Sequence, residues 1–122
     1  MNIGVIARVP FDEGGLGGKM TRETTFPPDD WRAKYFGPEN LSATMDRVDA
    51  LKTSLGEGVS LPETALRFIL SNPVVSTTIP GMRKPEHVEQ NAAASDAGSL
   101  DPAMLEKLKP HRWDRKPAPW SD

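Results

Sequence analysis

The sequence contains no cysteine, so it offers neither a disulfide framework nor a thiolate zinc site, and a reducing, cytoplasmic location is expected. An excess of basic residues is also absent: the formal net charge is -2, whereas a nucleic-acid-binding surface usually requires a basic excess. No apolar run approaches the roughly 20 residues of a membrane helix. Neither a nucleic acid nor a membrane is therefore expected as a partner.

Groups that carry out chemistry by themselves are equally scarce. The sequence contains no motif that pairs a nucleophile with a general base, and no side chains at the spacing of metal ligands. It also contains no pair of carboxylates in a catalytic motif. Asp12 and Glu13 lie beside a run of glycines, but a solvated loop accounts for them better. We expect no catalytic residue and no metal site within this chain.

Proline and glycine, by contrast, are plentiful. The chain has 12 prolines among its 122 residues, which is about twice the average usage of ~5%. A chain of this length allows one compact domain, and its composition predicts long irregular connections around a modest core. Long loops in a compact domain are more often functional than idle.

Two apolar, β-branched stretches are predicted to form strands. Residues 3–9 show little alternation, which is the pattern of a strand buried on both faces in a parallel sheet. Residues 74–79 form the second strand, which a Pro-Gly pair ends. A long loop over residues 10–40 follows the first strand and opens at Pro10.

Helical spacing fills most of the remaining chain. Residues 41–72 are predicted to contain two helices, the first with a leucine-rich stripe and the second opening with a capping box at Ser60. A loop and a helix follow within residues 81–95, and a short helix over residues 101–109 begins with an aspartate and a proline. The tail, residues 110–122, carries two tryptophans but no periodicity.

The order of these elements is strand, long loop, two helices, strand, helix, helix. This order predicts an α/β fold in which the two strands are parallel and joined by a right-handed crossover. A parallel pair alone leaves both sheet edges open and apolar faces uncovered. We therefore expect the chain to be part of something larger or to associate with another copy.

The loops that follow the two strands both have properties of a phosphate-binding site. The glycines from Gly14 to Gly18 let backbone amides approach a ligand closely, and Lys19 adds a cation. Arg83 and Lys84 precede a helix amino terminus, where free amides and the helix dipole favour an anion. Flexible glycine turns and a solvated basic pair are the alternatives. Both loops would face the same end of a parallel sheet, and loops at that end bind phosphate in many barrels.

Three stretches, in matching order over nearly the whole chain, resemble the aldo-keto reductase family. Residues 79–91, Ile-Pro-Gly-Met-Arg-Lys-Pro-Glu-His-Val-Glu-Gln-Asn, resemble its carboxy-terminal nucleotide motif. Residues 4–18 are similar to its seventh strand and the loop after it, and residues 65–73 to the helix before its eighth strand. The resemblance implies that residues 1–122 form a single segment of a (β/α)8 TIM barrel, comprising strands seven and eight and a carboxy-terminal extension.

The resemblance also implies NADP(H) as cofactor. Backbone from Pro10 to Leu16 would cover the pyrophosphate, Arg83 or Lys84 would supply charge to the 2′-phosphate, and the following helix would reach the adenine edge. The positions that the resemblance assigns to the cofactor are Pro10, Phe11, Gly14, Gly15, Leu16, Ile79, Gly81, Met82, Arg83, Lys84, His87, Gln90 and Asn91.

Two positions depart from the most familiar pattern of the family. Gly81-Met82 stands where many members have Lys-Ser, a variant found in bacterial branches, and His87 stands where many have an arginine for the 2′-phosphate. Because an ordinary histidine is mostly neutral near pH 7, the preference for NADP over NAD stays open. His87 is either a phosphate ligand or an exposed helix histidine.

The family's catalytic tyrosine, lysine, aspartate and histidine would, on the same resemblance, lie upstream of Met1. Tyr35, the single tyrosine, matches none of those positions and is interpreted as a packing residue. We therefore expect an NADP-binding portion that is inactive alone and whose partner is the missing amino-terminal barrel half. The alternative is an interaction module, derived from a barrel fragment, that associates with itself or docks through its open strand edges.

Overall fold

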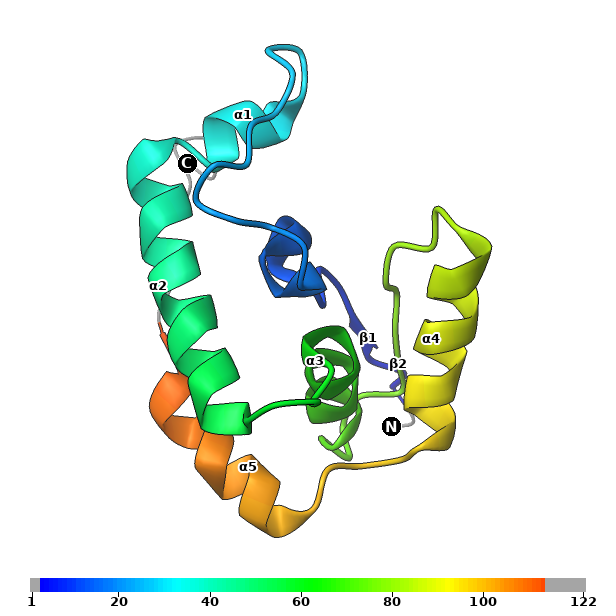
Figure 1. Cartoon of the computed structure of the whole chain (residues 1–122). Coiled ribbons are helices and arrows are strands. Elements are labelled where there is room, and N and C mark those ends of the chain that lie inside the picture. Colours follow the sequence, from blue (N-terminus) through cyan, green and yellow to red (C-terminus); the bar gives the residue numbers. More distant parts are fainter. Residues whose placement is uncertain (1–2, 114–122) are drawn as a thin grey trace.

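A computed structural model describes residues 3–113 and contains one two-stranded parallel sheet. Strand β1 (Ile6–Ala7) pairs with β2 (Thr77–Thr78), and Ile6 lies opposite Thr77. The helices, in chain order, are the 3-10 helix η1 (Asp12–Gly17), α1 (Trp31–Tyr35), α2 (Pro38–Leu55), α3 (Leu61–Leu70), α4 (Pro85–Asp96), α5 (Pro102–Leu108) and the 3-10 helix η2 (Lys109–His111). Helices α2 and α4 stand on opposite sides, with η1, α3 and the strands between them (Figure 1). The predicted α/β class and parallel pairing are confirmed.

The hydrophobic core is built on one face of α2. Phe36 before this helix and Leu61 after it complete the buried cluster, in which Val48 is only 1% exposed. Pro38 begins the helix at a position where the missing proline N–H costs no hydrogen bond. The buried residues of α2 recur at helical spacing and are Leu41, Thr44, Met45, Val48, Leu51 and Leu55.

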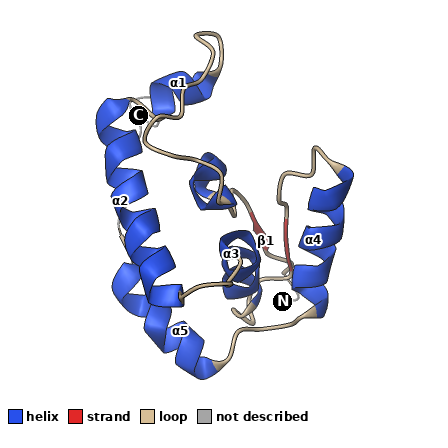
Figure 2. Ribbon diagram, in the orientation of Figure 1, coloured by secondary structure: helices blue, strands red, loops and turns tan. Residues whose placement is uncertain are grey.

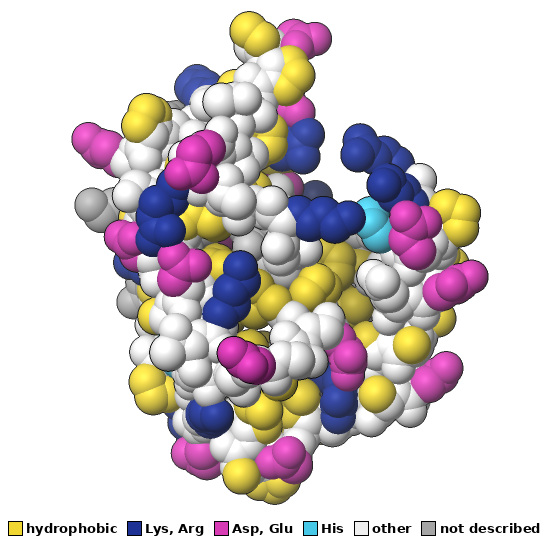
Figure 3. Space-filling view, viewed as in Figure 1, with side chains coloured by type: hydrophobic (Ala, Val, Ile, Leu, Met, Phe, Trp, Pro, Cys, Tyr) yellow, Lys and Arg dark blue, Asp and Glu magenta, His cyan; other side chains and the backbone are white. Residues whose placement is uncertain are grey.

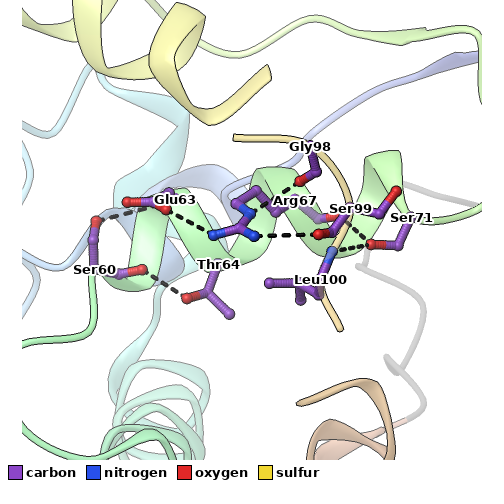
Figure 4. Close-up of polar contacts among 8 residues, drawn as sticks. All are labelled: Ser60, Glu63, Thr64, Arg67, Ser71, Gly98, Ser99 and Leu100. Carbon is purple, nitrogen blue, oxygen red and sulfur yellow. Dashed lines mark hydrogen bonds and ion pairs between the residues drawn. The ribbon is translucent and has the colours of Figure 1, made fainter. Parts of the chain in front are cut away.

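Helix α3 is fixed at both ends by side-chain hydrogen bonds. At its start, the Ser60 Oγ accepts a hydrogen bond from the backbone N–H of Glu63. Near its end, the Arg67 guanidinium donates to the carbonyl oxygens of Gly98 and Ser99, in the segment between α4 and α5 (Figure 4). The Ser71 Oγ accepts from the N–H of Leu100, 2.8 Å away, so that this segment follows the surface of α3.

Both strands are shorter than the sequence pattern predicts (Figure 2). Their apolar side chains are also more exposed. The first was expected over residues 3–9 and buried on both faces, yet Ile3 is 72% exposed and Ile6 is 60% exposed. The physical reason is that, within residues 3–113, β1 pairs with one strand, so one of its edges is left without a partner strand. Val9, in the left-handed region with φ 55°, turns the chain out of the strand direction.

The segment expected as a loop over residues 10–40 contains η1, α1 and the first residues of α2, which begins at Pro38. Helix α1 begins where the Asp30 carboxylate accepts a hydrogen bond from the N–H of Arg32. Within and after it, Tyr35 and Phe36 make an edge-to-face contact with ring centroids 4.8 Å apart, and Phe36 is buried.

In the tail, Trp113 lies under the Arg47 guanidinium at 5.0 Å, whereas residues 114–122, including Trp120, lie outside the described residues.

Candidate functional site

The loops that follow β1 and β2 enclose a cleft of about 620 Å³ at the carboxy ends of the strands. In the space-filling view a hollow with an apolar floor lies among basic side chains, with a histidine at its rim (Figure 3). One wall comes from the end of β1, η1 and α1, and the other from the end of β2 and the start of α4. The lining residues are Arg8, Val9, Pro10, Phe11, Glu13, Gly14, Gly17, Lys19, Arg32, Pro62, Ile79, Gly81, Met82, Arg83, Glu86, His87, Gln90 and Asn91.

The first wall has an unusual backbone. Val9, Asp12 and Glu13 all have positive φ values, of 55°, 50° and 55°. Such conformations cost about 1 to 3 kcal/mol each when the residue is not glycine, and they are least favourable for a β-branched residue such as Val9. The Tyr35 hydroxyl donates to the Asp12 carboxylate at 3.4 Å and helps to hold this stretch. Strained backbone of this kind is concentrated at functional sites.

The glycines that follow β1 face two different parts of the structure, the cleft and helix α2. Gly14, with φ 114°, lines the cleft and interrupts η1 together with Glu13. Gly15 and Leu16, expected to cover a pyrophosphate, instead face away from the cleft lining. Gly15 is buried, and a Cβ there would lie 3.1 Å from the Thr44 Cγ2 on α2, while Leu16 packs against the core cluster. The cause is the kink at Gly14, which turns the next residues toward α2.

The second wall is the loop after β2 and the first turns of α4. Lys84 is the N-cap residue of α4, and its side chain makes no capping hydrogen bond. Its carbonyl oxygen accepts from the N–H of His87, and the Asn91 side-chain amide donates to the carbonyl oxygen of Gly81 at 3.3 Å. The bond from Asn91 therefore fixes the loop over the helix start. The helix dipole favours an anion there, although Pro85 has no N–H and the N–H of His87 is already bonded.

The charge of the cleft is predominantly positive. Its lining includes Arg8, Lys19 and Arg83, which make no ion pair or side-chain hydrogen bond within residues 3–113. Arg32 also lines the cleft, but it is paired with Asp30, whose carboxylate lies outside the lining. Hydrogen bonds from the side chain and backbone of Arg32 lower the pKa of Asp30 from 3.8 to about 2. Glu13 and Glu86 also line the cleft, but the cations outnumber these carboxylates, so an anionic ligand would meet a net positive surface.

Most of the residues that the sequence assigned to a cofactor meet in this cleft. They are Pro10, Phe11, Gly14, Ile79, Gly81, Met82, Arg83, His87, Gln90 and Asn91. Lys84 lies outside the lining with Gly15 and Leu16, and its ammonium is 3.9 Å from the Glu86 carboxylate. His87 is half-buried rather than fully exposed.

Two cationic lining residues were not identified from the sequence. Arg8 lies in an apolar stretch that resembles the interior of a strand. Only its position at the carboxy end of β1 could have identified it as a residue of the cleft. Arg32 belongs to α1, a helix too short to show a period. Within residues 3–113, no group of His, Asp and Glu side chains could hold a metal ion, and no helix is long and apolar enough to span a membrane.

Fold and cleft together define an α/β protein with two parallel strands whose carboxy ends carry a site suited to an anionic ligand. The model of the aldo/keto reductase family matches residues 1–112, and the chain therefore belongs to that family. Its two parallel strands and helices are consistent with part of the TIM barrel of the family, whose members generally use NAD(P)H. No curated protein sequence matches the chain.

Proposed function

We propose that this chain is the carboxy-terminal, NADP(H)-binding portion of an aldo/keto reductase barrel, contributing strands seven and eight and a carboxy-terminal extension. The observation that carries the proposal is the single cleft that gathers the glycine-containing turn after β1 and the helix start after β2. A cleft of about 620 Å³ lies in the range of roughly 300 to 1,000 Å³ that is common for small-molecule sites.

The two walls would divide the nucleotide between them. The backbone around Phe11 and Gly14 would lie against the pyrophosphate, since glycine permits close approach. The Gly14 N–H itself donates to the carbonyl oxygen of Phe11 at 2.9 Å. Arg83 would supply charge to the 2′-phosphate, and His87 would lie beside it as a hydrogen-bond donor. Gln90 and Asn91 would lie along the adenine edge. The apolar lining, which includes Ile79 and Met82, would exclude water from the bound rings.

Reduction of a carbonyl needs a proton donor as well as the hydride carrier. The only tyrosine in the sequence, Tyr35, donates its hydroxyl to Asp12 and is absent from the cleft lining. No other residue of the chain matches the catalytic positions of the family. The proposed role is therefore cofactor binding, with the chemical step depending on residues from outside this chain.

Titration of NADPH, followed by the fluorescence of the reduced nicotinamide, tests this function. We expect saturable binding to the wild-type chain, with Arg83→Gln weakening it by about tenfold because one charge-assisted contact is lost. Lys107→Gln, on α5 and outside the cleft, is the charge-matched control and should bind like wild type. No binding at millimolar NADPH, or equal losses in both variants, would contradict the proposal.

A second function, an interaction module, is favoured by the exposed apolar residues on and around the strands. Ile3, Ile6, Val74 and Ile79 are each more than half exposed, although such residues are usually buried. The proposed partner is the amino-terminal part of a barrel or, failing that, a second copy. Sedimentation velocity over a range of concentrations tests self-association, and a monomer at all concentrations that also fails to bind a separately expressed amino-terminal barrel half would contradict this function.

A further inference from the structure

Arg32 differs from the other cations of the cleft because its guanidinium is already fixed. Its Nε lies 3.0 and 3.1 Å from the two carboxylate oxygens of Asp30, and its Nη2 lies 2.5 Å from Oδ2. The guanidinium carbon lies 4.8 Å from the ring centroid of Phe26. Its Nη1 donates to no protein atom among residues 3–113, and the side chain lines the cleft. One face and one edge of the group are held, and Nη1 keeps its donors for a ligand. The Glu13 carboxylate, which also lines the cleft, interacts electrostatically with the same group.

The support for Arg32 extends back into the core. Phe26 stacks on Phe36 with ring centroids 5.7 Å apart, and Phe36 is 4% exposed within the core cluster. Asp30 is held in turn, because its carboxylate also accepts the N–H of Arg32 at the start of α1. The guanidinium is therefore restrained by Asp30 and Phe26, and each of these residues is itself held by further contacts.

Arg8, Lys19 and Arg83 have no such support, since none of them makes an ion pair or side-chain hydrogen bond within residues 3–113. A flexible cation loses side-chain entropy when it binds an anion, whereas a fixed guanidinium loses little. A carboxylate that orients a binding group from behind is a common device of preorganised sites. Such a carboxylate also lowers the net positive charge of the site and so weakens its attraction for an anion. Its presence beside a cation is therefore better explained by a role in orienting that cation.

We propose that Arg32 is an oxyanion-binding residue of the cleft and that Asp30 positions it. The ligand group is either a phosphate of the nucleotide or the carboxylate of a carbonyl substrate, because a guanidinium donates to both. The phosphate alternative rests on the proposed NADP(H) function, whereas the carboxylate alternative does not.

Asp30→Asn separates positioning from simple attraction. Asparagine is as good an N-cap as aspartate, so the start of α1 is retained. The substitution removes a negative charge near the cleft, and on charge alone it should strengthen the binding of anions. If Asp30 positions Arg32, the same substitution weakens binding, because the guanidinium loses its bidentate partner.

Isothermal titration with inorganic pyrophosphate, pyruvate and NADPH provides the test. Arg32→Gln should weaken pyrophosphate or pyruvate by about five- to tenfold, as expected for one charge-assisted hydrogen bond at a partly exposed site. Arg32→Lys, which keeps the charge but not the fork, should recover part of the loss. Asp46→Asn is the matched control, because it removes one carboxylate from the similar pair of Asp46 with Arg22, outside the cleft. Circular dichroism confirms that each variant is folded.

The outcomes assign the ligand group or overturn the proposal. A loss confined to pyrophosphate and NADPH identifies the phosphate, and a loss confined to pyruvate identifies the carboxylate. Unchanged affinities in Arg32→Gln, or tighter binding in Asp30→Asn, overturn the proposal for Arg32. If the wild-type chain binds NADPH in that case, the proposed function still stands. Arg32-dependent pyrophosphate binding without NADPH binding overturns the proposed function alone. A wild-type chain that binds none of the three probes overturns both.

Discussion

The Nε of Arg67 on α3 donates to the carbonyl oxygen of Gly98 at 3.0 Å and so joins two segments 31 residues apart in the chain. The same guanidinium donates to Ser99 and, one helical turn away, to Glu63. The segment after α4 is therefore held against α3 by Arg67, together with Ser71. This matters for the cleft, because α4 supplies one of its walls.

Arg67→Ala should lower the free energy of unfolding by about 2 kcal/mol, because two backbone carbonyl oxygens lose a charged donor. Urea denaturation followed by circular dichroism measures the change. Lys52→Ala on α2, an exposed residue without an ion pair within residues 3–113, is the control and should change stability little. Equal stabilities of Arg67→Ala and wild type would show that water replaces the guanidinium without loss.

Two methionines in different surroundings should respond differently to truncation. Met45 on α2 is 2% exposed, and Met45→Ala should lower the free energy of unfolding by about 2 to 5 kcal/mol, because a cavity forms in the core. Met82 is 52% exposed at the cleft, and Met82→Ala should cost much less. Thermal unfolding of the two variants side by side is the measurement, and a larger loss in Met82→Ala would contradict the placement of the core.

Stability should also depend on the ionisation of Asp30. Its pKa is about 2 in the folded chain against an ordinary 3.8, because Arg32 stabilises the carboxylate. This contribution is fully present above about pH 4 and is lost as the pH falls toward 2, since protonation then removes the favourable interaction. The gap in Tm between wild type and Asp30→Asn should therefore shrink over that interval. The control is Glu57→Gln, an exposed residue outside any ion pair of residues 3–113; an identical trend there would exclude Asp30 as the cause.

Gly14 and Gly81 both line the cleft but differ in backbone conformation. Gly14 has φ 114°, so Gly14→Ala should cost about 1 to 2 kcal/mol of stability. Gly81 lies outside the positive-φ glycines, and a Cβ there meets nothing within 4 Å, so Gly81→Ala should be nearly neutral. Chemical denaturation of both variants checks the difference, and a neutral Gly14→Ala would show that the turn relaxes freely.

The helices were largely predictable because the features that start and stop them are local. The Ser60 and Asp101 caps accept hydrogen bonds from residues three positions ahead, within reach of a sequence pattern. Helix α1 was missed because five residues are too few to show a period. The strands proved shorter because pairing depends on neighbouring strands, and in the part of the chain that the structure describes β1 has only β2 beside it.

The site divides in the same way. The loop and helix start from Gly81 to Asn91 form one continuous motif, so the sequence alone could indicate them together. The direction of Gly15 depends on the kink at Gly14, and the place of Arg32 depends on contacts with Asp30 and Phe26. Asp30 and Phe26 are close to Arg32 in the sequence, but the packing of Gly15 against Thr44 and of Phe26 against Phe36 is a consequence of three-dimensional structure that a local pattern does not contain.

The buried face of α2 lies apart from the cleft, since none of its residues lines that space. Substitutions in the cleft should accordingly leave the fold intact more often than substitutions on that face. Ligand preference is then free to drift, or to be redesigned, in small steps. The separation makes it possible to vary the proposed nucleotide site while the hydrophobic core stays unchanged.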